Sequence, residues 1–211
     1  MQRDANAIRM TSESVDRGQM ARAVEAILAA RHIYIVGVRS SAALANYLNF
    51  YFRNIFDNVR LVSSTATSEM FEQLLRVGKD DVVIAISLPR YSSRTVKLPR
   101  FCRNSGAKVV AITDSDRSPG GKNADFLLTA KIDMVSLVDS LVAPLSLVNA
   151  LIVAIGLQAR RRAWRRPSPR IWSVSGTNTT RLNGSNKIVV VGGGGAPGCL
   201  PPERRRRPSR M

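Results

Sequence analysis

The chain has little of the chemistry that metal sites and covalent cross-links require. Its 211 residues include one histidine, His32, and two cysteines, Cys102 and Cys199. A single imidazole and two distant thiols exclude a disulfide framework and a His/Cys zinc cluster, and they suit a reducing cytosol. The polar start, Met1–Asn6, lacks the apolar segment of a secretory signal. We therefore expect a cytoplasmic protein that uses no metal and no other cofactor.

Acidic residues are scarce in one part of the chain only. Residues 159–211 hold 13 of the 32 Lys and Arg residues, one of the 15 Asp and Glu residues and half of the 14 glycines. This composition cannot bury enough apolar surface to offset the entropy of ordering, so we predict a disordered tail. Within it, only Lys187–Val191 resembles a strand, and that run has no periodic partner. The tail either binds nucleic acid weakly and non-specifically or has no evolved function, as an out-of-frame translation would.

One uncharged stretch is long enough to raise the question of a membrane span. Ser140–Leu157 contains no charged residue and is followed by three arginines. However, it contains Pro144 and Asn149, and it follows a pattern typical of a water-soluble α/β domain. A helix that is apolar all round is also found in protein cores and dimer interfaces. We therefore predict a core or interface helix and no contact with a membrane.

Helical and strand-like segments alternate along residues 19–158. Continuous apolar runs that predict strands occupy residues 32–38, 59–62, 81–87, 108–113 and 124–128. Helical periodicity marks residues 20–30, 40–51, 67–77, 92–104 and 137–157. This alternation predicts a parallel sheet covered by helices on both faces. Such sheets bind ligands beyond the carboxyl ends of their strands, so we expect the site after Gly37, Ser87 and Thr113.

Small hydroxyl residues and arginines follow two of these predicted strands. Gly37 ends the first strand, and the next helix starts near Arg39, Ser40 and Ser41. The second cluster follows another strand end and comprises Ser87, Arg90, Ser92, Ser93, Arg94 and Thr95. Hydroxyls and helix N-terminal amides at neighbouring strand ends predict a pocket for a phosphorylated, oxygen-rich ligand. Alternatively, the serines only cap helices and the arginines are solvated surface charges.

These motifs together resemble a SIS (sugar isomerase) domain. The resemblance covers about residues 8–158 and is narrowest to the effector domain of RpiR/MurR-type bacterial transcriptional regulators. It rests on four stretches: Gly37–Ser41, Ile86–Thr95, Ser105–Ser115 and Ser140–Leu145. It implies a three-layer α-β-α sandwich of the flavodoxin-like type, with a five-stranded parallel sheet that binds a phosphorylated sugar or amino sugar. It also implies a homodimer or tetramer.

The resemblance assigns phosphosugar contacts to Ser40 and Ser41 in the first loop, and to Ser87 and Ser92 in the second. The chain departs from the common pattern in having Pro89 and Arg90 where many SIS proteins have Ser-Gly. Such regulators read DNA through an N-terminal helix-turn-helix domain, and we expect residues 1–18 to hold only a remnant linker helix. DNA would then be bound through a domain outside this chain, or weakly through the tail.

A sugar-phosphate isomerase is the alternative to a ligand sensor. Aldose–ketose isomerisation needs a base beside the sugar, usually a glutamate or a histidine. His32 begins the first predicted strand, at the end opposite the expected pocket. Glu69 and Glu72 are the remaining candidates, and both also fit ordinary helix-surface carboxylates. We therefore expect a binding domain without catalytic residues.

Overall fold

A five-stranded parallel sheet forms the centre of the computed structural model, which describes residues 1–64, 66–132, 134–135, 138–165, 181–182 and 188–189. The strands are β1 (Ile33–Gly37), β2 (Val59–Val62), β3 (Val82–Ile86), β4 (Lys108–Thr113) and β5 (Phe126–Thr129). Their spatial order is β2-β1-β3-β4-β5, and every neighbouring pair is parallel. The predicted parallel sheet of five strands is therefore confirmed.

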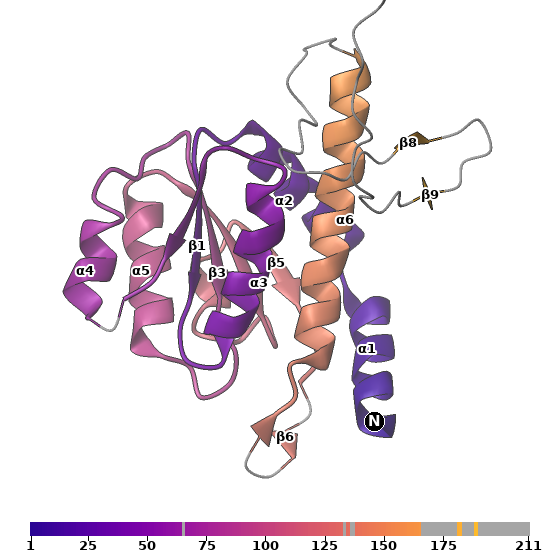
Figure 1. Cartoon of the computed structure of the whole chain (residues 1–211). Helices are drawn as coiled ribbons and strands as arrows, with labels where there is room; N and C mark the ends of the chain where they lie inside the picture. The colour runs from indigo at the N-terminus through magenta and orange to yellow at the C-terminus, as the bar shows by residue number, and fades with distance from the viewer. Residues whose placement is uncertain (65, 133, 136–137, 166–180, 183–187, 190–211) are drawn as a thin grey trace, which may run out of the picture. The chain divides into compact units, whose positions relative to one another are not determined.

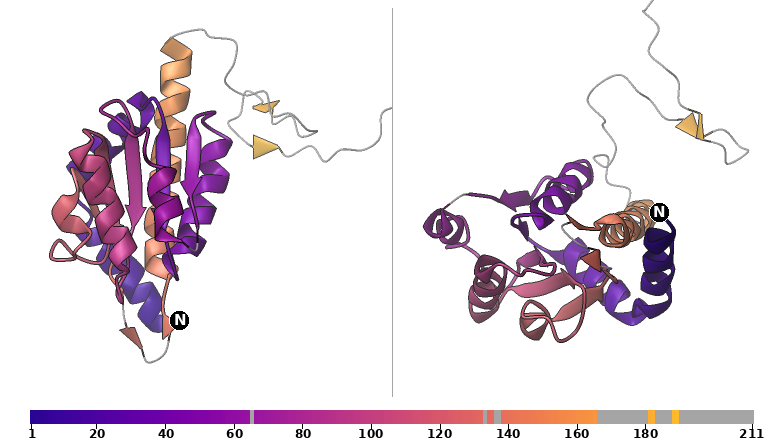
Figure 2. Two further views of the ribbon diagram at one scale, coloured as in Figure 1. Left: turned by 90° about the vertical axis from the view of Figure 1, so that its left-hand side faces the viewer. Right: turned by 90° about the horizontal axis from the view of Figure 1, so that it is seen from below.

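Helices cover both faces of this sheet and make the three layers that we predicted (Figures 1 and 2). Apolar side chains of one face pack under α2 (Arg17–Ala29), α3 (Ser41–Arg53) and α6 (Val142–Arg165). The other face packs under α4 (Thr67–Glu72) and α5 (Ser93–Asn104). An additional helix, α1 (Gln2–Ser14), lies beside α6 in Figures 1 and 2. A single 3-10 turn, η1 (Gly121–Asn123), precedes β5.

Two helix boundaries differ from the sequence prediction. Helix α4 ends at Glu72 and not near residue 77, because the amides of Leu74, Leu75 and Val77 each bond to a carbonyl three residues earlier. Leu74 and Val77 are nevertheless buried, so their apolar spacing marked a buried face and not a continuous helix. Helix α6 starts at Val142, after an unpredicted antiparallel hairpin of β6 (Met134–Val135) and β7 (Val138–Asp139).

The C-terminal part of the chain forms a separate unit, residues 172–211. Its described residues are β8 (Arg181–Leu182) and β9 (Ile188–Val189), which pair antiparallel. Ile188 and Val189, within the predicted strand, therefore have a strand partner that the sequence pattern did not reveal. Residues 159–165 of the predicted disordered tail belong instead to α6, and the remainder of the tail lies outside the described residues. Helix α6 itself continues to Arg165, past the predicted domain boundary at residue 158.

Helix α6 supplies much of the core on its side of the sheet. Its inward-facing side chains are buried, namely Ala143, Leu147, Val148, Leu151 and Ile155. By length and composition the segment Val142–Arg162 could also cross a membrane, with a mean hydropathy of 1.9 over 18 residues. A core helix of this length passes the same criterion, and here one face of α6 packs directly on the sheet.

A buried carboxylate joins the amino ends of β1 and β3. Asp81 is 1% exposed and accepts hydrogen bonds from the Arg31 guanidinium at 2.8 and 3.0 Å and from the Gly78 amide at 2.9 Å. The His32 ring lies 3.2 Å away. Burial by itself would raise the pKa of Asp81, but these hydrogen bonds outweigh burial, and the pKa is lowered below its ordinary value.

We expect this carboxylate to make folding stability depend on pH. Because its pKa is lower in the folded than in the unfolded chain, its contribution is complete above the unfolded value near pH 4 and is lost as the pH falls through the folded value. Replacement of Asp81 by Asn should cost about 1–2 kcal/mol at pH 7, since Arg31 can turn to solvent. Urea unfolding of both proteins between pH 3 and pH 7 checks this. The substitution should remove part of the stability that the unsubstituted protein loses as the pH falls. If the free energies of unfolding of the two proteins fall in parallel with pH, the Asp81 carboxylate is not the cause of that loss.

Candidate ligand-binding site

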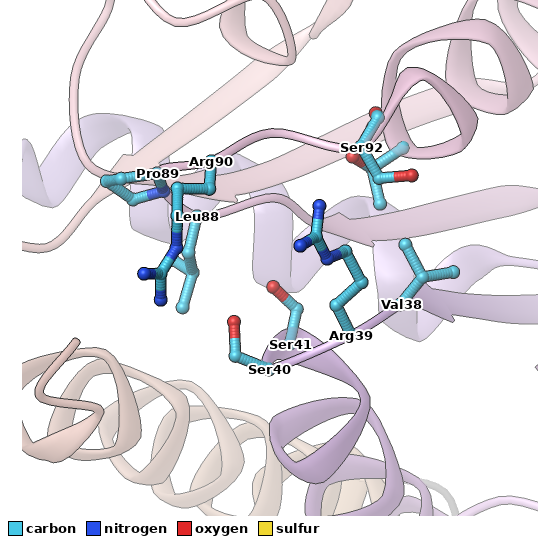
Figure 3. A pocket seen from close by; sticks show the side chains of 9 residues that line it. Val38, Arg39, Ser40, Ser41, Leu88, Pro89, Arg90 and Ser92 are labelled. Atoms are coloured by element: carbon cyan, nitrogen blue, oxygen red, sulfur yellow. Dashed lines mark hydrogen bonds between the residues drawn. The ribbon is translucent and has the colours of Figure 1, made fainter. Parts of the chain in front are cut away.

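The candidate site lies where β1 and β3 end side by side. From this pair the chain crosses over one face of the sheet through α3 and over the other face through α5, so the strand order reverses here. Parallel sheets bind ligands at this kind of position. A cavity of about 240 Å³ opens there, and its lining comes from both loops: Val38, Arg39, Ser40, Ser41, Leu88, Pro89, Arg90, Ser92 and Thr95 (Figure 3).

The loop after β1 brings α3 close to the sheet. A side chain at Gly37 would place its Cβ 2.7 Å from the Ser41 carbonyl oxygen, so only glycine allows this approach. Ser40 occupies the N-cap position of α3, but its side chain makes no capping hydrogen bond. The capping interpretation is therefore wrong for Ser40. Figure 3 shows the hydroxyls of Ser40 and Ser41 directed into the space between the two loops.

An arginine in left-handed backbone conformation stands in each loop. Arg39 has φ 58° and Arg90 has φ 61°, and these are the only non-glycine residues with positive φ among those the structure describes. This conformation costs an L-residue about 1–2 kcal/mol. Figure 3 shows the Arg90 guanidinium directed toward the Ser40 side of the cavity and that of Arg39 directed toward the Ser92 side. Strained backbone of this kind is concentrated at binding sites.

Arg90 is held by an ion pair and is not a freely solvated helix charge. Its Nη2 lies 2.6 Å from Oδ2 of Asp139, whose side chain is 3% exposed. Asp139 belongs to β7, so the unpredicted hairpin supplies the partner. The segment that follows also contacts α1, because the Ser140 hydroxyl donates to Asp4 at 2.6 Å. No sequence pattern indicated the ion pair between Arg90 and Asp139, because 49 residues separate the two.

The remaining hydroxyls of the second loop have different structural roles. Ser92 caps α5 and accepts a hydrogen bond from the Arg94 amide at 3.3 Å. The hydroxyl oxygens of Ser87 and Thr95 lie 2.9 Å apart, and both residues are 2% exposed. Thr95 lines the 240 Å³ cavity, whereas Ser87 lines neither of the two cavities at this site. A direct ligand contact by Ser87 therefore stays a prediction, and the contact that the structure gives it is with Thr95.

A second cavity adjoins the first and shares Val38, Arg39 and Ser92 with it. It measures about 710 Å³ and is also lined by Gly37, Ala42, Ser63, Ser64, Ser93 and Arg94. Ser63 and Ser64 were not among the residues predicted from the sequence. Their signal was available, because two serines directly follow β2 and the carboxyl end of β2 lies at the same edge of the sheet as that of β1.

A tyrosine and an aspartate fix the loop from the side of β4. The Tyr91 hydroxyl donates to Oδ1 of Asp114 at 2.7 Å, and the Thr113 hydroxyl donates to the same oxygen at 3.0 Å. Burial, together with this carboxylate, raises the pKa of Tyr91 to about 12. The phenol is therefore protonated at neutral pH and remains a donor. This contact holds the loop between Arg90 and Ser92 in place.

The candidate bases of an isomerase lie outside both cavities. His32 precedes β1 at the amino end of the sheet and contacts Asp81. Glu72 is exposed at the end of α4. Glu69 lies nearer, because its carboxylate is hydrogen-bonded to the hydroxyl of Ser64, which lines the larger cavity. Of these three candidate bases, only Glu69 contacts a residue that lines a cavity of the site.

Comparison with known proteins shows the family of the chain and its fold. The SIS domain family model matches residues 26–154. An HTH-type transcriptional regulator of uncharacterised role from Clostridium perfringens is 24% identical over 124 residues, which cover 59% of this chain and 44% of that protein. This chain thus spans less than half of the length of that curated relative.

Two solved structures extend the comparison. The sugar isomerase domain of an RpiR transcription factor from Sphaerobacter thermophilus superposes with a TM-score of 0.72 at 27% identity, covering 78% of this chain and 91% of that one. The NanR protein of Vibrio vulnificus, complexed with ManNAc-6P, gives a TM-score of 0.66 at 20% identity, covering 79% and 65%. The second comparison shows a common fold. The chain belongs to the SIS domain family, and its relatives include bacterial HTH-type and RpiR-type transcriptional regulators.

Proposed function

We propose that the 240 Å³ cavity binds a phosphorylated sugar or amino sugar and that the protein is the ligand-sensing part of an RpiR-type transcriptional regulator. The observation that carries this proposal is the pair of inward-directed hydroxyls at the start of α3. Ser40 makes no capping bond, so its hydroxyl is available to a ligand. The first turn of α3 adds backbone amides, of which that of Ala42 bonds to the Arg39 carbonyl, and the positive end of the helix dipole; both favour a phosphate group.

The polar groups around the cavity match the needs of such a ligand. A phosphate carries three acceptor oxygens and a charge of about −1.5 to −2 at pH 7. Ser41 of α3 lines the cavity together with Ser92 and Thr95 at the start of α5, and the Arg90 guanidinium adds a charged donor. In this proposal the phosphate lies at the amino end of α3, and the sugar hydroxyls bond to the loop after β3. Gly37 and Ser93 line only the larger of the two cavities, and a contact of either with the ligand stays a prediction.

The wider role follows from the relatives and remains part of the proposal. The domain senses its ligand in the cytoplasm without chemical conversion, and DNA is read by a separate helix-turn-helix domain of the whole regulator. A homodimer or tetramer fits the exposed apolar side chains on α3 and α6. Phe50 is 64% exposed, Val153 58% and Leu157 56%. Side chains this apolar commonly become buried when copies of a chain associate.

Isothermal titration calorimetry against a panel of hexose, pentose and amino-sugar phosphates tests the proposal. At least one of these compounds should bind, and Ser40→Ala should weaken that binding about tenfold, since a hydrogen bond to a charged group contributes about 1.5 kcal/mol. The free energy of unfolding should not change, because the Ser40 hydroxyl makes no capping bond. Ser12→Ala, at an exposed position on α1, is the matched control and should leave affinity unchanged.

The same samples distinguish a sensor from an isomerase. The proximity of Glu69 to Ser64 is the observation that favours catalysis. We expect no interconversion of aldose and ketose phosphates during prolonged incubation with the purified chain. Turnover that Glu69→Gln abolishes would replace the sensor proposal with the isomerase. Absence of heat across the whole panel would refute ligand binding at this site.

A further inference from the structure

The site contains more positive charge than one phosphate requires. Three arginines line the two cavities: Arg39, Arg90 and Arg94. Arg90 is paired with Asp139 at 2.6 Å. Among the residues that the structure describes, Arg39 and Arg94 form no ion pair. Two guanidinium groups at one rim without acidic partners repel each other, and this arrangement is favourable when an anion binds between them.

The two cavities also differ in size, and binding of one phosphate group does not account for the volume of the larger cavity. Small-molecule sites usually measure about 300–1,000 Å³. The cavity with Ser40 and Ser41 measures about 240 Å³, and the adjoining one about 710 Å³. Because Arg39 and Ser92 line both, a ligand that starts in the smaller cavity can continue into the larger one. The side chains that line the larger cavity therefore determine which chemical group the distal part of the ligand can carry.

The distal cavity offers hydroxyls and guanidinium groups, as an anion site does. Ser63, Ser64 and Ser93 line it together with Arg39 and Arg94. Arg94 is in the first turn of α5, a helix of 12 residues that contains no acidic residue. The carboxylate of Glu69 lies beside this lining, where the Ser64 hydroxyl is hydrogen-bonded to it. Arg39 and Arg94 thus bring two positive charges to this lining.

We infer that the ligand carries a second anionic group, a carboxylate or a second phosphate, and that Arg39 and Arg94 bind this group in the larger cavity. The inference rests on the proposed phosphosugar site and specifies its ligand class: a phosphorylated sugar acid or a sugar bisphosphate. Arg94 is the residue that determines specificity, because it lines only the larger cavity. Arg39 serves both anionic groups, since it lies between them.

Calorimetry with matched pairs of compounds tests this inference at 150 mM salt, where long-range attraction by the basic chain is screened. Glucose 6-phosphate and 6-phosphogluconate differ by a carboxylate, and fructose 6-phosphate and fructose 1,6-bisphosphate differ by a phosphate. In at least one pair the compound with two anionic groups should bind at least tenfold more tightly. Arg94→Gln should reduce that preference to less than threefold, while the affinity for its singly charged counterpart changes less than twofold. The pair that responds identifies the second group.

A charge-matched variant separates a specific contact from general attraction. Arg100→Gln removes the same charge from the same helix at an exposed position outside both cavities, and it should preserve the preference. Equal affinities within both pairs, or equal effects of Arg94→Gln and Arg100→Gln, would overturn the inference while leaving the phosphosugar proposal intact. If none of the four compounds and no member of the wider panel binds, the proposed function itself fails.

Discussion

Replacement of Leu151 by alanine is expected to lower the free energy of unfolding by about 2–5 kcal/mol. Leu151 is fully buried in α6, and it belongs to the cluster that joins α2, α3 and α6 to the sheet. Removing three side-chain carbons there loses their transfer free energy and leaves a cavity that a sheet and three helices can fill only in part. Urea unfolding followed by far-UV circular dichroism measures the loss.

A leucine on the surface is the control for this experiment. Leu75 is 68% exposed, so Leu75→Ala should change stability by less than about 0.5 kcal/mol. The comparison also tests the position of α6, whose length and hydropathy would allow a membrane span. Equal small effects of both substitutions would mean that the inner face of α6 is not part of a core in water, which would contradict the packing described above.

The fold could be predicted because it depends on patterns that are local in sequence. Each strand of the sheet is a continuous β-branched or apolar run, since a strand between two helical layers is buried on both sides. The loops after β1 and β3 could be predicted for the same reason. They follow the first and third strand runs, and parallel strands present their carboxyl ends at one edge. Only the rule of strand order was needed to bring Ser40 and Ser92 to one cavity.

What could not be predicted depends on contacts between distant segments or on backbone dihedral angles. The pairing of Arg90 with Asp139 needs a short hairpin that no periodic pattern marks. The positive φ of Arg39 has no signal in an arginine, because glycine or asparagine is the usual residue there. Ser87 was assigned to the ligand from a resemblance, whereas its bond to Thr95 depends on the turn between them.

The packing of α3 against the sheet and the shape of the site both depend on the absence of a side chain at Gly37. An added Cβ would lie 2.7 Å from the Ser41 carbonyl oxygen and 2.8 Å from the Ala45 Cβ. Both neighbours belong to α3, so the helix as a whole would have to move away from β1. The side chain of Ser41 and the N-cap residue Ser40 would move with it. The helix is in place only because position 37 has no side chain.

We therefore expect Gly37→Ala to cost about 3 kcal/mol of stability, at the upper end of the usual cost of overpacking. The affinity for the phosphorylated ligand should fall at least tenfold at a temperature where the variant is folded, because the α3 amides and hydroxyls no longer meet the loop after β3. Gly156→Ala is the matched control. No atom lies within 4 Å of its added Cβ, and alanine within α6 should raise stability by about 0.5–1 kcal/mol. If the Gly37→Ala variant has the same free energy of unfolding and the same ligand affinity as the unsubstituted protein, the close approach of α3 to β1 does not position the site.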